Sequence, residues 1–277
     1  MPSAFLSPVS DVLVRLSDAA YQMANSICGR SQALDTLLTL PVNNQLVKAA
    51  VVGGCLLAAW HIAKDEAALL RSRRIILLTL VAAVLVVAVT KSVSKTVFLP
   101  RPFIQSQKAY HLEGERLVES PRLAYRVPLD DESQSDYRKL LEGNILANHL
   151  GSFPSDHAGF YATLAAGTWL ASRQLGTVAL VWTFVVILGT RIVNGMHSPL
   201  DIAAGAGLGI GVLLACQWTL GHWAKGPLDA VTRWTLRHPA LSSVVMFIVA
   251  FESANTLDNL RPLLKTALNL GKWMIGG

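Results

Sequence analysis

The uncharged run that begins at Ile75 constrains the fold more than any other feature of the sequence. From Ile75 to Thr90 every residue is apolar apart from two threonines, and the next charged residue is Lys91. A helix that crosses a bilayer takes about 20 consecutive, mostly apolar residues. The run therefore predicts a transmembrane helix, and the chain is expected to be a membrane protein.

Other segments repeat this pattern along the chain. Charged residues make up only 15% of the sequence, against about 25% in a typical soluble domain. Five segments have the length and composition of a span: 46–63, 75–98, 158–171, 175–193 and 200–220. A sixth, from Leu241 to Phe251 and extending to about Leu257, is shorter and carries Glu252. The sequence predicts an all-α fold, a polytopic membrane bundle of about six transmembrane helices.

The other segments divide the chain into three parts. Residues 1–43 mix apolar and charged positions, such as Leu13, Arg15 and Asp18, which favours an amphipathic helix at the membrane interface over a spanning or re-entrant one. Residues 44–222 form the main membrane domain, with a polar loop at about 103–153 that is expected to fold as a cap. Residues 223–277 form a C-terminal segment with the possible sixth span.

Basic residues predict the orientation in the membrane. By the positive-inside rule, the connections that hold them are expected on the cytoplasmic side. These residues are Lys64, Arg71, Arg73, Arg74, Arg173, Lys225, Arg233 and Arg237. The opposite side then receives the polar loop and the turn from Asn194 to Pro199. Because the basic residues flank apolar runs, the net charge of +6 indicates topology and no nucleic-acid partner.

Neither the cysteines nor the start of the chain adds a site. Cys28, Cys55 and Cys216 lie far apart, which predicts neither a disulfide framework nor a metal-binding spacing. No lysine or arginine precedes Arg15, so the sequence lacks the basic start of a signal peptide.

Ionisable residues at the ends of three predicted spans are expected to meet on one side of the membrane. Such residues are costly in this position and therefore indicate function. They fall in three stretches: Lys95 with Arg101-Pro102, then Pro154-Ser155-Asp156-His157, then Thr190-Arg191 followed by His197 and Asp201. The predicted topology places all three on the side opposite the basic connections.

The residue types in these stretches suit phosphoryl transfer. Arginine and lysine supply bidentate and point-charge contacts to phosphate oxygens, and Ser155 stands where a helix is expected to begin, so that backbone N–H groups face an anion. His197 precedes Asp201 by four residues, and a carboxylate on one ring nitrogen leaves the other free to attack phosphorus. His157 would then protonate the leaving oxygen.

Each of these residues has a structural interpretation when it is taken alone. Lys91 and Lys95 suit anchors that reach the headgroups, Ser155 suits a helix cap, and a lone histidine such as His197 is commonly structural. The joint spacing of Thr-Arg, five residues, His, three residues, Asp favours the catalytic interpretation over these.

The three stretches resemble the signature of the type 2 phosphatidic acid phosphatases, a family that shares its site with vanadium haloperoxidases and glucose-6-phosphatase. That signature reads Lys, six residues, Arg-Pro; then Pro-Ser-Gly-His; then Ser-Arg, five residues, His, three residues, Asp. The resemblance covers about residues 45–220. It implies that His197 is the nucleophile, Asp201 its orienting partner and His157 the general acid. The residues expected to bind phosphate are Lys95, Arg101, Ser155, Asp156 and Arg191.

This sequence departs from the signature at three positions. Thr190 replaces serine, and Asp156 replaces glycine, which makes the second motif similar to that of bacterial undecaprenyl-diphosphate phosphatases. Five residues instead of six separate Lys95 from Arg101, and Ser94 occupies the expected lysine position. Three alternatives follow: Lys95 fills the lysine role through a local change of helix register, Lys91 fills it, or no lysine does.

The resemblance implies hydrolysis without a metal or other cofactor, through a phosphohistidine, of a lipid phosphate or diphosphate. Undecaprenyl diphosphate is the first expectation, in a bacterial inner membrane with the site facing the periplasm or the outside. Phosphatidylglycerophosphate, phosphatidic acid, lipid A and transfer of phosphate to an acceptor are the alternatives. A non-enzymatic transporter is disfavoured, because its polar groups would lie near the midplane of the membrane. The oligomeric state is open.

Overall fold

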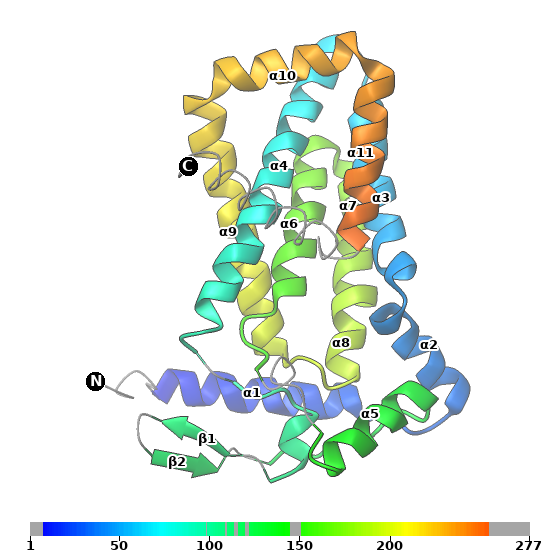
Figure 1. Ribbon diagram of the computed structural model, residues 1–277, viewed down its shortest axis with the longest axis vertical. Helices are drawn as coiled ribbons and strands as arrows, with labels where there is room; N and C mark the ends of the chain where they lie inside the picture. The colour runs from blue at the N-terminus through cyan, green and yellow to red at the C-terminus, as the bar shows by residue number, and fades with distance from the viewer. Residues whose placement is uncertain are drawn as a thin grey trace, which may run out of the picture.

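A computed structural model describes residues 8–97, 99–108, 110–113, 116–119, 122–144 and 151–254. The main helices stand side by side, while α1 lies across one end of the bundle and α10 across the other (Figure 1). The helices are α1 (Pro8–Asn25), α2 (Gln32–Asn43), α3 (Gln45–His61), α4 (Glu66–Val93), α5 (Asp131–Leu141), α6 (Asp156–Ala171), α7 (Arg173–Val181), α8 (Gly189–Val193), α9 (Pro199–Trp223), α10 (Lys225–Arg237) and α11 (Pro239–Ala254).

Short elements complete the described chain. A π-helical segment, η3 (Trp182–Leu188), joins α7 to α8 in one continuous rod. The cap contains a 3₁₀ turn, η1 (Ile104–Ser106), helix α5 and an antiparallel hairpin of β1 (Tyr110–Glu113) and β2 (Arg116–Glu119). In the hairpin Tyr110 pairs with Glu119 and Glu113 pairs with Arg116. The expectation of helices is confirmed for the bundle, and the cap adds this hairpin.

The described residues support three to five of the about six spans that the sequence predicts. Three helices of the described chain are long and apolar enough to cross a membrane: α4, the α7–α8 rod and α9. Two bent pairs raise this to five if each pair is one span, namely α2 with α3, bent by 61°, and α10 with α11, bent by 110°. Helix α6 was expected to span but has only 16 residues. The expected extension of the last span beyond Ala254 lies outside the described residues.

Helix α4 ends earlier than its sequence predicts. The expected span reached Phe98, which is not among the described residues, whereas α4 ends at Val93. Hydroxyl side chains near this end donate to backbone carbonyls, Ser94 to Lys91 at 3.0 Å and Thr96 to Val93 at 2.8 Å. Such bonds compete with helix continuation, and Lys95 consequently lies in a turn.

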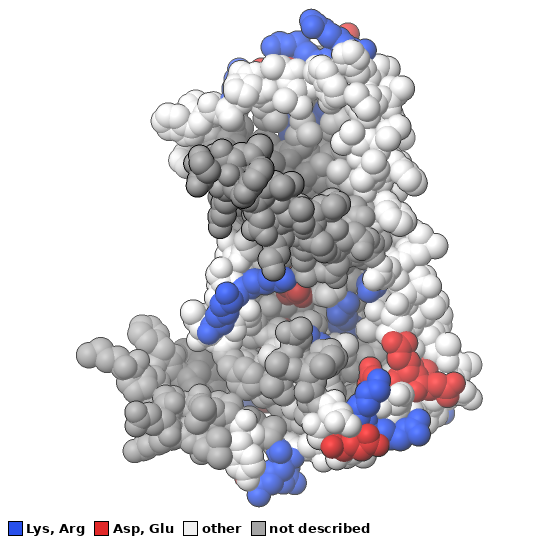
Figure 2. All heavy atoms as spheres, viewed as in Figure 1, with Lys and Arg blue, Asp and Glu red and all other residues white. Residues whose placement is uncertain are grey.

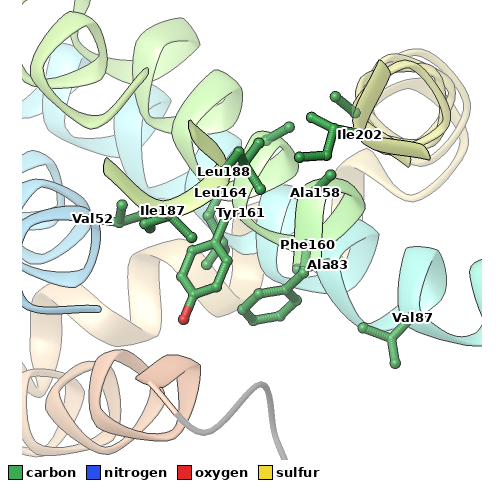
Figure 3. Close-up of a cluster of buried hydrophobic side chains, with 12 residues drawn as sticks. Val52, Ala83, Val87, Ala158, Phe160, Tyr161, Leu164, Ile187, Leu188 and Ile202 are labelled. Atoms are coloured by element: carbon green, nitrogen blue, oxygen red, sulfur yellow. The ribbon is translucent and has the colours of Figure 1, made fainter. Parts of the chain in front are cut away.

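Helix α6 occupies the centre of the bundle. It packs against α3, α4, α7, η3 and α9, and its side chains Phe160, Tyr161 and Leu164 are fully buried. Figure 3 shows these residues in a cluster with Ile187 and Ile202. A helix that is apolar all round is expected in such a position.

Glycines let α9 approach α6 at backbone distance. A Cβ atom on Gly205 would overlap the carbonyl oxygen of Ser155, and one on Gly209 would overlap that of Gly159. Gly205 and Gly209 form a small-xxx-small pattern, which permits close helix packing in membranes. The contact brings the start of α6 beside the start of α9.

The end of the bundle away from the cap is fixed by arginines. Arg73 donates to the carbonyl of Trp60 at 3.2 Å and to the hydroxyl of Thr235 in α10 at 3.0 Å, and Arg74 pairs with Asp229. Figure 2 shows coloured charged side chains at both ends of the described surface, with a largely white band between them on the side of α3 and α11. This distribution is the one expected of a protein that crosses a membrane.

The N-terminal segment, expected as one amphipathic stretch, contains two helices. Gly29, with φ +71°, lies between α1 and α2. On α1 the apolar side chains of Val12, Leu13, Leu16 and Met23 are exposed. The placement of α1 in the membrane interface stays a prediction.

Candidate active site

The turn between α8 and α9 is built around Gly195. This residue has φ +69°, in the left-handed region that glycine enters without steric cost. The backbone N–H groups of Met196 and His197 both point to the carbonyl of Arg191, at 2.9 and 3.3 Å. The turn therefore holds His197 against the end of α8 that carries Arg191, and the segment of residues 193–200 is called the catalytic turn below, after its candidate role.

His197 and Asp201 lie together, as their spacing predicts. Nδ1 of His197 is 3.8 Å from Oδ2 of Asp201, and both side chains are almost completely buried. Asp201 is also part of a capping box, in which its Oδ2 accepts from the backbone N–H of Ser198 at 2.7 Å and the Ser198 hydroxyl accepts from the N–H of Asp201 at 3.2 Å. A capping box fixes the first turn of a helix, so the carboxylate is held beside the imidazole.

The start of α6 lies against the start of α9. Ser155 is the N-cap of α6, is fully buried and accepts from the N–H of Ala158 at 3.3 Å. Its own backbone N–H donates to the carbonyl of Asp201 at 3.1 Å. The N-terminus of α6 therefore lies against the start of α9, and the N–H groups of His157 and Ala158 in its first turn are capped by the side chains of Asp156 and Ser155.

Asp156 forms a second pair of a carboxylate and an imidazole. Its Oδ1 lies 2.8 Å from Nδ1 of His157 and accepts from the backbone N–H of the same histidine at 2.7 Å. The ring of His157 also stacks on Tyr161, with centroids 6.4 Å apart. Since Nδ1 is occupied by the carboxylate, Nε2 is the nitrogen left for exchange of a proton with a ligand.

Arg101 reaches the same place from the loop after α4. Its Nε donates to the carbonyl of Gly151 at 3.3 Å, and Nη1 lies 4.0 Å from the sulfur of Met196. Burial lowers the pKa of Arg101, and the charges of Asp156 and Asp201 oppose that shift. The Arg101 side chain is half-buried, and its guanidinium lies near the carboxylates of Asp156 and Asp201.

Three buried polar atoms of the site have no hydrogen-bond partner among the described residues: Nε of Arg191, Nδ1 of His197 and Oδ1 of Asp201. Buried groups of this kind are costly, and in native structures each calls for an explanation. Their concentration in one place indicates a site arranged for a ligand.

The structure brings together most of the residues singled out in the sequence, but not the lysines. Arg101, Ser155, Asp156, His157, Arg191, His197 and Asp201 converge at the cap end of the bundle. Lys95 and Lys91 are exposed, and neither side chain makes a hydrogen bond or an ion pair with the described part of the chain. No group of three or more potential metal ligands is found among the described residues.

A cavity of about 180 Å³ adjoins Arg101 on the cap side. It is bounded by α2, α5 and the catalytic turn. Its lining combines aromatic, amide and carboxylate side chains: Tyr125, Tyr137, Asn43, Asn194, Glu132 and Asp136. The lining also contains a second cation besides Arg101, Lys139, which is already paired with Asp136 at 2.8 Å.

Helix α1 contributes polar residues that the sequence did not single out. Its Ser17 and Asn25 hydrogen-bond to the backbone at the two ends of the catalytic turn. Asn25 is separated from Val193 by 168 positions in the chain, and Ser17 is separated from Leu200 by 183 positions. Their spacing of eight residues on one helix face was the available signal.

Comparison with known proteins supplies independent information. A family model described as the PAP2 superfamily matches residues 74–224, which is more than half of the chain. The bacitracin transport permease protein BcrC of Bacillus licheniformis is 41% identical over 68 residues, which cover 24% of this chain and 33% of that protein. The aligned region thus spans about a third of the relative's length. No solved structure matches the chain.

Proposed function

The chain belongs to the PAP2 superfamily, and on that premise we propose that it is a membrane phosphatase that hydrolyses a lipid phosphate or diphosphate through a phosphohistidine on His197. The observation that carries the proposal is the set of unpaired polar atoms on Arg191, His197 and Asp201. Phosphate oxygens would accept from Nε of Arg191, while Nδ1 of His197 would pair with Asp201 and leave Nε2 to face phosphorus.

In the first half of the reaction Nε2 of His197 attacks phosphorus. The bond from phosphorus to the leaving oxygen breaks, and His157 gives that oxygen a proton. Asp201 accepts a hydrogen bond from Nδ1 of His197 once the present 3.8 Å separation closes, as catalytic hydrogen bonds commonly do when the ligand binds. The charge on the equatorial oxygens is stabilised by Arg101, Arg191 and the positive end of the α6 helix dipole.

The second half releases the phosphate. Water attacks phosphorus, His157 takes a proton from that water, and the bond from phosphorus to His197 breaks. Free phosphate leaves, and His197 returns to its neutral form. Lys95, whose side chain is exposed, would add a point charge to the phosphate as the substrate binds.

Asp156 acts on His157 in this scheme and does not contact the phosphate. A carboxylate has no donor for phosphate oxygens, whereas its 2.8 Å contact with the imidazole stabilises the protonated ring. This role replaces the phosphate contact that the sequence led us to expect.

Undecaprenyl diphosphate is the substrate that we favour. The Pro-Ser-Asp-His motif is similar to that of bacterial undecaprenyl-diphosphate phosphatases, and hydrolysis would yield undecaprenyl phosphate. The positive-inside rule favours a site on the periplasmic or outer side of a bacterial cytoplasmic membrane, because α10 and its arginines lie at the opposite end of the bundle.

The cavity beside Arg101 favours a second class of substrate. Its amide, aromatic and carboxylate lining suits a neutral, hydroxylated group better than a second phosphate, since the carboxylates would repel one. A lipid phosphate with a glycerol or sugar headgroup, such as phosphatidylglycerophosphate or lipid A, meets this description. Transfer of the phosphoryl group to a hydroxyl bound there would use the same intermediate.

A transport function, which the name of the Bacillus licheniformis relative would indicate, is less consistent with the position of the site. The ionisable residues of the site lie at one end of the bundle, and the central parts of the described long helices are apolar. A transport path needs polar groups near the midplane.

The test is a phosphate-release assay on the purified chain in detergent, in the presence of EDTA. The panel comprises undecaprenyl diphosphate, phosphatidylglycerophosphate, phosphatidic acid and lipid A. We expect release that vanadate inhibits and His197→Ala abolishes, with Gln22→Ala, an exposed position on α1, as the control. Release that stops in EDTA and returns with zinc or magnesium would contradict the mechanism, and absence of release from every lipid would contradict the function.

A further inference from the structure

Helix α1 lies along the catalytic turn and is hydrogen-bonded to it at both ends. Asn25 donates from its side-chain amide to the carbonyl of Val193 at 2.8 Å. At the other end of the turn, Ser17 accepts from the backbone N–H of Leu200 at 3.0 Å. These two contacts fix the residues on either side of the segment that carries His197.

The contacts follow a regular order. Ser17, Tyr21 and Asn25 recur every four residues, so they share one face of the helix. All three are buried, with exposed fractions of 8%, 0% and 2%. As the chain advances along this face, its contacts move backward along the turn, from Leu200 through Gly195 to Val193. The helix and the turn therefore run antiparallel, in register.

Tyr21 supports the middle of the turn. A Cβ atom added to Gly195 would lie 3.2 Å from the hydroxyl oxygen of Tyr21 and 2.8 Å from the ring of Tyr125. The left-handed conformation of Gly195 and the absence of a side chain there are thus matched to this helix. The Tyr21 hydroxyl itself has no partner among the described residues.

The same helix faces the carboxylate that orients the nucleophile. Burial raises the pKa of the Asp18 carboxyl, and the negative charge of Asp201 raises it further. Asp18 follows Ser17, which contacts the first turn of α9, so this effect agrees with the hydrogen-bonded register of α1.

Asn25 also joins the cap to the catalytic turn. Its side-chain oxygen accepts from the backbone N–H of Arg126 at 2.7 Å, and its amide donates to the carbonyl of the same residue at 3.1 Å. One side chain thus holds the end of α8, helix α1 and the cap segment near Tyr125 together. Buried amide networks of this kind, when fully satisfied, specify a single arrangement.

From these contacts we infer that Ser17, Tyr21 and Asn25 are positioning residues for the phosphatase reaction, and that α1 completes a site which the matched family region, residues 74–224, does not build alone. They act by holding the backbone from Val193 to Leu200, so that His197 and Arg191 meet the same phosphate. The inference rests on the proposed function for its activity readout and on the geometry of the turn for its binding readout.

The experiment compares the full chain with Asn25→Ala, Ser17→Ala, Ser17→Thr and Gln22→Ala in detergent. Gln22 is exposed on the same helix and serves as the matched control, while Ser17→Thr keeps a hydroxyl acceptor for Leu200. Turnover and the KM for the lipid substrate are recorded well below each variant's Tm. The Kd for vanadate is obtained separately, from the dependence of Tm on vanadate concentration.

We expect Asn25→Ala to lower kcat by about tenfold or more with KM changed by less than about twofold, because a small misplacement of catalytic groups costs rate before it costs binding. Vanadate should bind more weakly to Asn25→Ala and to Ser17→Ala than to the parent, and the variant with the larger loss of kcat should show the larger rise in Kd. Ser17→Thr should recover most of the kcat and most of the vanadate affinity that Ser17→Ala loses. Gln22→Ala should match the parent.

The results that would overturn the inference differ from those that would overturn the proposed function. A lower Tm in Asn25→Ala with unchanged kcat and vanadate Kd would reduce α1 to a stabilising helix and overturn the inference. If Asn25→Ala does not fold, equal kcat and vanadate Kd in Ser17→Ala and Ser17→Thr would overturn it. A parent chain that binds vanadate but hydrolyses no lipid would overturn the proposed function instead, and the vanadate Kd values would then decide the inference.

Discussion

Nδ1 of His197 lies 3.8 Å from Oδ2 of Asp201, while the same carboxylate oxygen lies only 2.7 Å from the backbone nitrogen of Ser198. Asp201 thus closes the first turn of α9 and also stands beside His197, the proposed nucleophile. A change at this position that preserves the first task isolates the second.

Asp201→Asn provides that change. An asparagine oxygen still accepts from Ser198, but the neutral amide no longer stabilises the charge that His197 gains on attack. We expect kcat to fall by about 10²-fold or more, with Tm close to that of the parent. The Kd for the lipid should change little when Asp201→Asn is added to His197→Ala, a variant that binds the substrate without turning it over. A variant with parental kcat would show that the carboxylate serves only the helix.

The protonation of His197 predicts the acidic side of the pH profile. Burial lowers the pKa of His197 below its ordinary value of 6.5, the charges of Arg101 and Arg191 lower it further, and Asp201 opposes the shift. The imidazole therefore stays neutral and nucleophilic to lower pH than a solvated histidine does. We expect the acidic limb of kcat/KM, after division by the substrate's own ionisation measured by ³¹P titration, to lie below pH 6.5. A limb above that value would contradict this assignment.

Asp156 predicts a dependence on the leaving group. Without its carboxylate, the protonated form of His157 loses its closest stabilising charge, among the arginines Arg101 and Arg191. We expect Asp156→Asn and Asp156→Gly to slow a lipid alcohol monophosphate by about 10²-fold and 4-nitrophenyl phosphate by much less, since nitrophenolate leaves without a proton. Equal losses on both substrates would show that Asp156 supports the site in another way.

Arg101 and Lys95 predict unequal losses. Arg101 is held by Gly151 beside both carboxylates, whereas Lys95 is exposed in a turn. We expect Arg101→Ala to lower kcat/KM by about 10²- to 10³-fold and Lys95→Ala by no more than about tenfold, as for a flexible point charge. Lys91→Ala, one helical turn away, is the control and should behave as the parent. A larger loss in Lys91→Ala than in Lys95→Ala would transfer the lysine role.

The packing of α9 on α6 predicts a structural effect at Gly205. A methyl group at this position would overlap the carbonyl oxygen of Ser155 and lie 3.1 Å from Cβ of Ala158. Gly205→Ala should therefore displace the start of α6 and lower both Tm and kcat. Gly207→Ala is the matched control, because no atom lies within 4 Å of its added Cβ. Parental activity in Gly205→Ala would show that the two helices separate without cost.

Much of the bundle could be predicted from the sequence, because each long helix is encoded locally by an apolar run. The residues of the motifs could also be placed on one side, since charge alone orders the connections. The length of α4 was overestimated, because the hydroxyls of Ser94 and Thr96 end a helix that apolar composition would extend.

The contacts that assemble the site were not predictable in the same way. Judged from the local sequence, Gly205 and Gly209 are weak helix formers. Their role in close packing is evident only when the backbone of another helix lies against them. Asp156 read as a phosphate contact, because a sequence does not show the rotamer that turns its carboxylate to the adjacent His157. The hydrogen bond from Asn25 to Val193 joins residues 168 positions apart in the chain. No local pattern in a single sequence indicates that two such distant residues meet.

The shortness of α6 has a consequence for how the two products would part. Sixteen residues rise about 24 Å, whereas the hydrocarbon core of a bilayer is about 30 Å thick. We therefore expect Ser155 and His157, at the head of α6, to lie below the level of the headgroups, at a depth that a phosphate reaches while its tail stays among the acyl chains. The dephosphorylated lipid would slide back sideways into the leaflet, and the freed phosphate would depart through the cap into water.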